Sequence, residues 1–312
     1  MTFSPLVLMI HLSQHSQANY SIQPIDSCAA ACTLRWRQRK LVVDCADETP
    51  PLLPSPQDQQ WLTNCLQRSP VALVKLDLAM GEIGLESWAT ACHQAKKPAY
   101  LRLSSTPNMP QKLRPWNWQL KRIVDWLAAA ILLLLLSPLM LCLAALISVF
   151  SPGPIFFEQW RVGERGKLFK IIKFRTMAVG AEHLHHQVMG TQTGLHKLKH
   201  DPRVTPLGYW MRKYSLDELP QLFNVLRGEM SLVGPRPWAL YDAVRISPDL
   251  RLRLNALPGI TGAWQVQGRS TLIDLNIVNC GDLTYLNSWS IRQDFKFLLM
   301  TIPKVLSGFG AY

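Results

Sequence analysis

Between Trp126 and Phe150 the chain reads WLAAAILLLLLSPLMLCLAALISVF, a run of 25 residues without a formal charge. An α-helix rises about 1.5 Å per residue, so a run of this length can cross the roughly 30 Å hydrocarbon core of a bilayer. The segment therefore predicts a membrane-associated protein.

Ser137 and Pro138 interrupt this run in its middle. Proline removes a helix hydrogen bond and clashes with the preceding turn, so each half would reach only about halfway through the core. We expect residues 123–150 to form a re-entrant helix broken at Ser137-Pro138, although the residues alone equally allow a kinked helix that crosses the membrane. Basic residues, which prefer the cytoplasm, flank both ends: Lys112, Arg114, Lys121 and Arg122 precede the run, and Arg161, Arg165, Lys167, Lys170 and Lys173 follow it.

The net charge of the chain is +12 and its pI is near 9.5, which calls for an anionic partner. Nucleic acid and anionic lipid headgroups both qualify. The charge favours lipid, because ten Lys and Arg residues stand against three Asp and Glu between Lys112 and Arg175 and bracket the uncharged run. A nucleic-acid binder would leave that run unexplained, so we expect no nucleic-acid partner. The seven scattered cysteines fit a reduced, cytosol-facing protein.

The remaining sequence divides into two regions joined by a linker. Residues 1–104 are expected to form a small soluble α/β domain, because a strand, a helix and a second strand are indicated between residues 71 and 103. This part faintly resembles a STAS-type regulatory domain. Residues 105–111 have linker composition, and residues 112–312 form a second domain that includes the membrane helix.

The segment from Trp289 to Leu306 has the pattern of an amphipathic helix. Such a helix either packs into a core or lies on a membrane surface, and we favour the core. The apolar residues at helical spacing are Ile291, Phe295, Leu298, Leu299, Ile302 and Val305.

Asp217 and Glu218 stand side by side in the stretch Ser215-Leu216-Asp217-Glu218-Leu219-Pro220, and Pro235-Arg236-Pro237 follows it. Two adjacent carboxylates can divide labour, one as a nucleophile and the other as a metal ligand or base. Cationic side chains nearby suit an anionic substrate such as a diphosphate. The pattern therefore indicates phosphoryl transfer. Ser215 and Glu218 also match a capping box, in which the serine caps a helix and the glutamate reaches back to it.

Two runs, RKYSLDELPQL at 212–222 and MSLVGPRP at 230–237, closely resemble the signature of the bacterial sugar transferases. These are the monotopic phosphoglycosyl transferases, which load a sugar phosphate onto a polyprenyl phosphate carrier. The resemblance extends over residues 111–312 through further matches in the same order, among them KFRTM at 173–177 and PGITG at 258–262.

Two places depart from the family pattern. Trp238 stands just after Pro235-Arg236-Pro237, where the family usually has a glutamate, and residues 279–282, Asn-Cys-Gly-Asp, are an unusual version of the stretch before the tyrosine. The first departure would alter how the sugar or the metal is held. Neither removes the carboxylate pair.

The resemblance implies a covalent mechanism with Asp217 as the nucleophile. Asp217 would attack the sugar-bearing phosphate of a UDP-sugar and release UMP, and polyprenyl (undecaprenyl) phosphate would then take the phosphosugar. Glu218 would bind Mg2+ together with Asp217, or assist the incoming phosphate. Cations nearby would hold phosphate oxygens, and the candidates are Lys173, Arg175, Arg203, Arg212 and Arg236.

The implied fold is α/β (α+β) and membrane-associated. It combines the small N-terminal unit, the re-entrant helix and a compact, largely helical catalytic domain on the cytoplasmic face of the inner membrane. The activity would initiate the synthesis of exopolysaccharide or a related glycan. The alternative is a membrane-anchored regulatory or binding protein whose transferase domain is not catalytic. The identity of the sugar and homo-oligomerisation stay open at this point.

Overall fold

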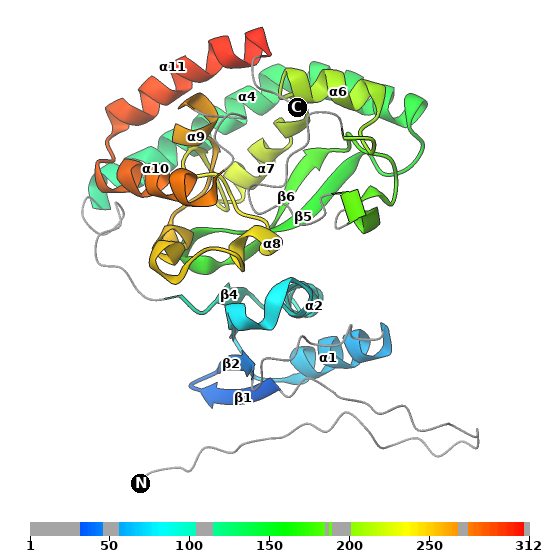
Figure 1. Cartoon of the computed structure of the whole chain (residues 1–312), viewed down its shortest axis with the longest axis vertical. Coiled ribbons are helices and arrows are strands. Elements are labelled where there is room, and N and C mark those ends of the chain that lie inside the picture. The colour runs from blue at the N-terminus through cyan, green and yellow to red at the C-terminus, as the bar shows by residue number, and fades with distance from the viewer. Residues whose placement is uncertain are drawn as a thin grey trace. The chain divides into compact units, whose positions relative to one another are not determined.

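The computed structural model of the chain describes residues 32–45, 56–103, 115–184, 187–188, 201–267 and 274–308 (Figure 1). The chain divides at Arg102 and Leu103 into two compact units. The predicted linker, residues 105–111, lies outside the described residues.

The first unit is a four-stranded sheet with two helices. Its strands lie in the order β1-β2-β3-β4; β1 and β2 form an antiparallel hairpin, whereas β2, β3 and β4 run parallel. Parallel neighbours need a crossover connection, and α1 and α2 supply these. The predicted strand–helix–strand run is present as β3, α2 and β4. The elements are β1 (Cys32–Arg37), β2 (Lys40–Cys45), α1 (Pro56–Arg68), β3 (Leu73–Leu76), a 3-10 turn (Leu78–Met80), α2 (Gly81–Gln94) and β4 (Ala99–Leu101).

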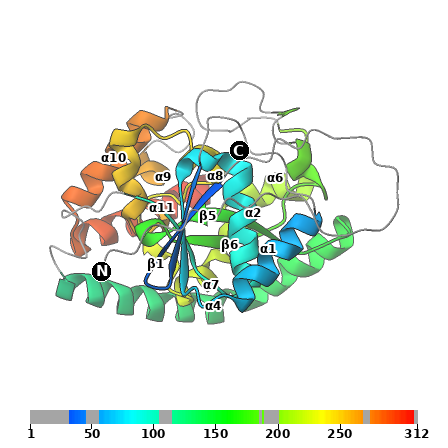
Figure 2. The ribbon, with the colours of Figure 1, turned by 90° about the horizontal axis from the view of Figure 1, so that it is seen from below.

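A single 36-residue helix, α4 (Pro115–Phe150), contains the whole uncharged run. Figures 1 and 2 show that its two halves run in different directions. Among the described residues it is the one helix that is long and apolar enough to cross a membrane. Its most apolar 18-residue stretch has a mean hydropathy of 2.8. It begins ahead of residue 123, the predicted start, because its first turns are packed into the fold.

Ser137 and Pro138 lie in the interior of α4. Proline cannot donate a hydrogen bond, which leaves the carbonyl of Leu134, four residues earlier, without its helical partner. The Ser137 hydroxyl donates to that carbonyl oxygen at 2.8 Å, and the helix continues through Pro138. The helical backbone is therefore continuous through Pro138, whereas the predicted re-entrant course of α4 in a bilayer stays a prediction.

α4 has a buried side and an exposed side. The exposed side is apolar: Leu134 is 76% exposed and Leu141 is 71% exposed. A continuous apolar surface of this kind marks a contact with a membrane or another protein. The buried residues form two groups, one on either side of Ser137-Pro138, and within each group they recur every three or four positions. They are Trp118, Lys121, Asp125 and Ala129 in the first group and Met140, Leu143 and Ile147 in the second.

The second unit packs short strands and helices against the buried side of α4. β5 (Phe156–Val162) and β6 (Leu168–Phe174) form an antiparallel hairpin, and β7 (Ser231–Val233) pairs in parallel with β8 (Gly259–Thr261). The helices are α6 (Pro206–Lys213), α7 (Gln221–Leu226), α8 (Leu240–Ala243), α9 (Ala263–Gln267), α10 (Leu275–Asn287) and α11 (Ile291–Ser307), with 3-10 turns η2 (Glu164–Gly166), η3 (Ala181–Leu184), η4 (Leu216–Glu218) and η5 (Pro248–Asn255).

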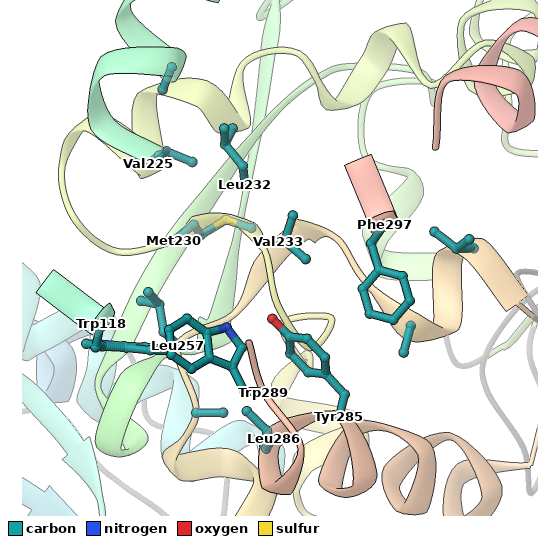
Figure 3. Close-up of a cluster of buried hydrophobic side chains, with 14 of the residues drawn as sticks. Trp118, Val225, Met230, Leu232, Val233, Leu257, Tyr285, Leu286, Trp289 and Phe297 are labelled. Atoms are coloured by element: carbon teal, nitrogen blue, oxygen red, sulfur yellow. The ribbon is translucent and has the colours of Figure 1, made fainter. Parts of the chain in front are cut away.

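Aromatic side chains are prominent in the core of this unit (Figure 3). Trp118 of α4 meets Trp289 edge to face, with 5.2 Å between the ring centroids. Tyr285 of α10 lies 5.6 Å from Phe297 of α11. The start of the apolar helix is therefore an integral part of the folded unit. Aliphatic side chains complete the cluster, among them Val225, Met230, Leu232, Val233, Leu257 and Leu286.

Most of the predicted apolar stripe of α11 is exposed. Asp294 and Phe297 face the core instead, because Asp294 pairs with Lys121 of α4. The interpretation of this stripe as core is therefore wrong. A helix with such a face is typical of a membrane surface. Its exposed apolar residues are Ile291, Phe295, Leu299, Met300, Ile302 and Leu306.

Trp118→Ala is expected to lower the free energy of unfolding by about 3–5 kcal/mol, because it removes a buried ring from the core. Trp116→Ala is the matched control, since Trp116 lies two residues away on the same helix and is 82% exposed. Chemical unfolding of the detergent-solubilised protein would measure both. Equal effects of the two substitutions would contradict the packing of α4.

Candidate active site

The two adjacent carboxylates lie on a sharply turned segment after α6. Ser215 adopts the left-handed backbone conformation, with φ 54° and ψ 23°, and the 3-10 turn η4 follows. This conformation is uncommon for a residue with a Cβ and often occurs at functional turns. The Ser215 side chain does not cap the turn, because an N-cap needs an extended backbone. The capping-box interpretation is therefore wrong.

Asp217 is a buried carboxylate, 8% exposed. Burial raises the pKa of Asp217 above its ordinary value, and the charge of Lys173 opposes this rise. Glu218 raises the same pKa further, while Arg212 lowers it. The Asp217 anion is thus poorly solvated and depends on its neighbouring cations.

Glu218 is held by Lys173 of β6. The Lys173 ammonium lies 2.7 Å from Glu218 Oε1, and both side chains are largely buried. Burial lowers the pKa of Lys173, and the carboxylate of Glu218 opposes that decrease. The charges of Arg236 and Asp217 also act on Lys173. The two carboxylates, the lysine and Arg236 therefore share one site.

Arg212 and Arg236 reach this site from different elements. Arg212, in the last turn of α6, donates from Nε to the Thr176 hydroxyl at 2.9 Å, and its charge acts on Asp217. Gly208 permits this close approach of α6, since a Cβ there would lie 2.1 Å from the Thr176 carbonyl oxygen. Arg236 is half-buried and lies over the ring of Trp264, at 5.1 Å from its centroid.

Arg175 and Arg203 have other partners. The Arg175 guanidinium donates to the carbonyl oxygens of Ser151 and Pro152, which follow the end of α4. Arg203 forms a two-point ion pair with Asp201, with Nε–Oδ1 2.9 Å and Nη2–Oδ2 2.7 Å. These contacts are structural, at the end of the apolar helix and before α6, and the predicted role of both arginines in substrate binding stays a prediction.

Arg161 is a further cation of the site that the sequence pattern did not reveal. It is 8% exposed, and its charge acts on both Arg236 and Glu218. Burial lowers its pKa. In the sequence it looks like one of several basic residues beside the apolar run. The one local feature that distinguishes Arg161 is its position in the strand β5, because a buried arginine is unusual there.

The arrangement suits an anionic, phosphate-bearing ligand. Asp217 and Glu218 stand among cations that come from different elements, in a site where burial strengthens electrostatic attraction. Arginine can hold phosphate oxygens at two points, and a lysine acts as a point charge. The cations are Arg161 of β5, Lys173 of β6, Arg212 of α6 and Arg236 of the loop after β7.

Residues 116–308 match the family described as bacterial sugar transferase, and the chain belongs to that family. The family membership predicted from the sequence is thus confirmed. The exopolysaccharide production protein ExoY of Rhizobium meliloti is 37% identical over 235 residues, which cover 72% of this chain and 99% of that protein.

Two further relatives carry names that state an activity. The UDP-glucose:undecaprenyl-phosphate glucose-1-phosphate transferase of Caulobacter vibrioides is 42% identical over 200 residues, covering 62% of this chain and 72% of that protein. The galactosyl transferase CpsE of Streptococcus agalactiae is 44% identical over 162 residues, covering 51% of this chain. The match spans 36% of the length of CpsE.

Asp217→Asn is expected to raise the melting temperature at neutral pH. Because the folded-state pKa of Asp217 is raised, its stabilising contribution is present below the ordinary aspartate pKa and is lost as pH rises through the folded-state value. At neutral pH the wild-type protein therefore carries the cost of a buried anion, which asparagine removes. Melting curves across pH would show the difference shrinking in acid. A lower melting temperature of the variant at neutral pH would contradict the electrostatics of the site.

Proposed function

We propose that this protein transfers a sugar-1-phosphate from a UDP-sugar to polyprenyl (undecaprenyl) phosphate through a covalent intermediate on Asp217. The observation that carries the proposal is the buried Asp217 carboxylate, adjacent to Glu218 and surrounded by cations. The names of the relatives support the reaction class, since one is a glucose-1-phosphate transferase to undecaprenyl phosphate. The product would initiate the synthesis of an exopolysaccharide or related glycan.

In the first step a carboxylate oxygen of Asp217 attacks the phosphorus that carries the sugar. The bond from this phosphorus to the bridging oxygen breaks, and UMP leaves with the electron pair. In the second step an oxygen of polyprenyl phosphate attacks the same phosphorus and releases the Asp217 carboxylate. Covalent catalysis suits a water-soluble donor and a lipid acceptor, because the two need not meet in one transition state.

The environment of Asp217 favours this chemistry. A desolvated carboxylate is a stronger nucleophile than one in water. The raised pKa of Asp217 has the same cause, the loss of solvent around its carboxylate. The approach of an anionic phosphate to an anion is unfavourable unless cations offset it. Lys173 and Arg212 act on Asp217 already, and Arg236 adds a further charge beside Lys173.

The carboxylates also fit a magnesium ion. Mg2+ is usually bound by one or two carboxylates together with phosphate oxygens of the substrate, and Asp217 and Glu218 present such hard oxygen ligands. Among the described residues no cluster of three or more His, Cys, Asp or Glu side chains forms a complete metal cage. When bound, the ion would offset the negative charge of the diphosphate.

The apolar faces of α4 and α11 support attachment to a membrane, where the lipid acceptor resides. Both helices expose large apolar side chains while their opposite sides pack into the same unit. Basic residues such as Lys167 and Lys170, which follow α4, would contact anionic headgroups. The catalytic unit would then lie on the cytoplasmic face of the inner membrane.

Incubation with labelled UDP-sugar and Mg2+ but without lipid acceptor tests the covalent mechanism. We expect a burst of at most one equivalent of UMP and label retained on the protein, which added polyprenyl phosphate discharges. Asp217→Asn should give no burst, and chelation of Mg2+ should suppress it. Arg236→Ala should lower the rate of the burst by about ten- to a hundredfold, because it removes a charge-assisted contact to the substrate phosphate. Turnover only when both substrates are present, with no label trapped, would exclude the intermediate.

Single cysteines at Asn117 and Lys167 test the topology, because both positions are exposed and lie on either side of the apolar run. In a background without the native cysteines, an impermeant maleimide should label both from the cytoplasmic side alone. This is the result expected of a helix that enters and leaves one leaflet. Labelling of the two positions from opposite sides would establish a spanning helix instead.

A further inference from the structure

The Arg236 loop, residues 233–238, is held along its length by hydrogen bonds to its carbonyl groups. Pro235 and Pro237 have no N–H, so the loop is attached mainly through its carbonyls, beside one bond from the Gly234 N–H to the Thr261 carbonyl oxygen at 2.9 Å. Three buried cations each take one carbonyl: Lys121 Nζ binds Val233 O at 3.0 Å, Arg253 Nη2 binds Arg236 O at 2.5 Å, and Arg161 Nη1 binds Pro237 O at 3.2 Å. Backbone N–H groups of Gly259 and Val162 take the carbonyls of Pro235 and Trp238.

Arg253 of η5 acts on the middle of this loop and is itself firmly fixed. Its side chain is 3% exposed, and Nε and Nη2 both donate to Asp282 Oδ2, at 2.8 and 2.6 Å. The guanidinium lies over the Trp238 ring, 4.6 Å from its centroid. The Trp238 indole donates in turn to Asn279 Oδ1 at 3.2 Å.

A buried ion pair of this kind is a weak source of stability, because desolvation offsets much of the attraction. Burial lowers the pKa of Arg253 and raises the pKa of Asp282, and each charge opposes the shift of the other. A well-packed apolar pair could fill the same space at no loss of stability. The ion pair fixes the orientation of the planar Arg253 guanidinium. While this group binds Asp282, its Nη2 atom also donates to the carbonyl oxygen of Arg236.

We infer that Arg253 is a positioning residue, which holds the backbone of Arg236 so that the Arg236 guanidinium faces the carboxylate site. The inference rests on the proposed function, in which Arg236 binds a substrate phosphate. Arginine is long, so a small rotation of its peptide displaces the guanidinium by about 1 Å or more, and such a displacement can cost about a hundredfold in rate.

Arg253→Lys tests this role, because lysine keeps the positive charge but lacks the planar fork that serves Asp282 and the Arg236 carbonyl together. We expect kcat/KM for the UDP-sugar to fall by about tenfold or more. Arg251→Lys is the matched control, since Arg251 lies on the same turn and donates to the carbonyl of Ile246, outside the loop. It should change kcat/KM by less than about twofold.

A double-mutant cycle separates positioning from general stabilisation. If Arg253 acts through Arg236, Arg253→Lys should have less than about a twofold further effect in an Arg236→Ala background. A loss of equal size in both backgrounds would overturn the inference, as would full activity of Arg253→Lys alone. Normal transfer by Arg236→Ala would instead refute the phosphate-binding role of Arg236, and so the two failures are distinguishable.

Melting temperatures of the detergent-solubilised variants show which of them are folded. Should Arg253→Lys fail to fold, Trp238→Phe serves the same cycle. It keeps an aromatic face beneath the guanidinium but removes the donor to Asn279. We expect a smaller loss of transfer, absent in the Arg236→Ala background. Unchanged transfer, or a loss that persists in that background, would contradict the positioning role.

Discussion

The buried ammonium group of Lys121 is the contact on which this fold most depends. It lies 2.7 Å from Asp294 Oδ2 and 3.4 Å from Asp125 Oδ2, and it donates to the carbonyl of Val233. All of these groups are buried, so the loss of the Lys121 ammonium would leave two carboxylates without their cation, at a cost of about 3–5 kcal/mol. One side chain thereby joins the apolar helix α4 to β7 and α11.

The rest of this polar cluster is satisfied by the aromatic core. Tyr285 donates to Asp294 Oδ1 at 2.6 Å and the Trp289 indole to Oδ2 at 3.1 Å. Burial raises the pKa of Tyr285, and the charge of Asp294 raises it further, so the phenol keeps its proton and remains a donor. A partly satisfied buried polar network is less stable than an apolar core. The hydrogen bonds to Asp294 therefore fix the orientation of the Tyr285 and Trp289 rings, in addition to the packing of these rings. The direction of Asp294 then decides which side of α11 faces outward.

The sequence predicts the features that depend on local chemistry. Each of these features is a property of neighbouring residues and can be recognised in the sequence. They are the uncharged run, the strand–helix–strand pattern and the adjacent Asp217 and Glu218. The burial of Lys121 and Arg161 cannot be predicted in this way, since both look like basic residues flanking a membrane segment. Each has a partner far along the chain, Asp294 for Lys121 and the Pro237 carbonyl for Arg161. Ser137 shows the same limit, because the sequence does not reveal that its hydroxyl donates to the Leu134 carbonyl oxygen that Pro138 leaves without a helical donor.

The two departures from the family pattern lie in contact with each other, which gives them a common physical explanation. Trp238 stands in place of the usual glutamate and donates to Asn279, the first residue of the unusual stretch, whose last residue, Asp282, pairs with Arg253. A carboxylate at the tryptophan position would need a cationic partner once buried, and a neutral indole needs only an acceptor. The two departures are thus joined by one hydrogen bond, from the Trp238 indole to Asn279. Since Lys121 holds the start of the Arg236 loop from α4, the geometry of the site is tied to the element that meets the membrane.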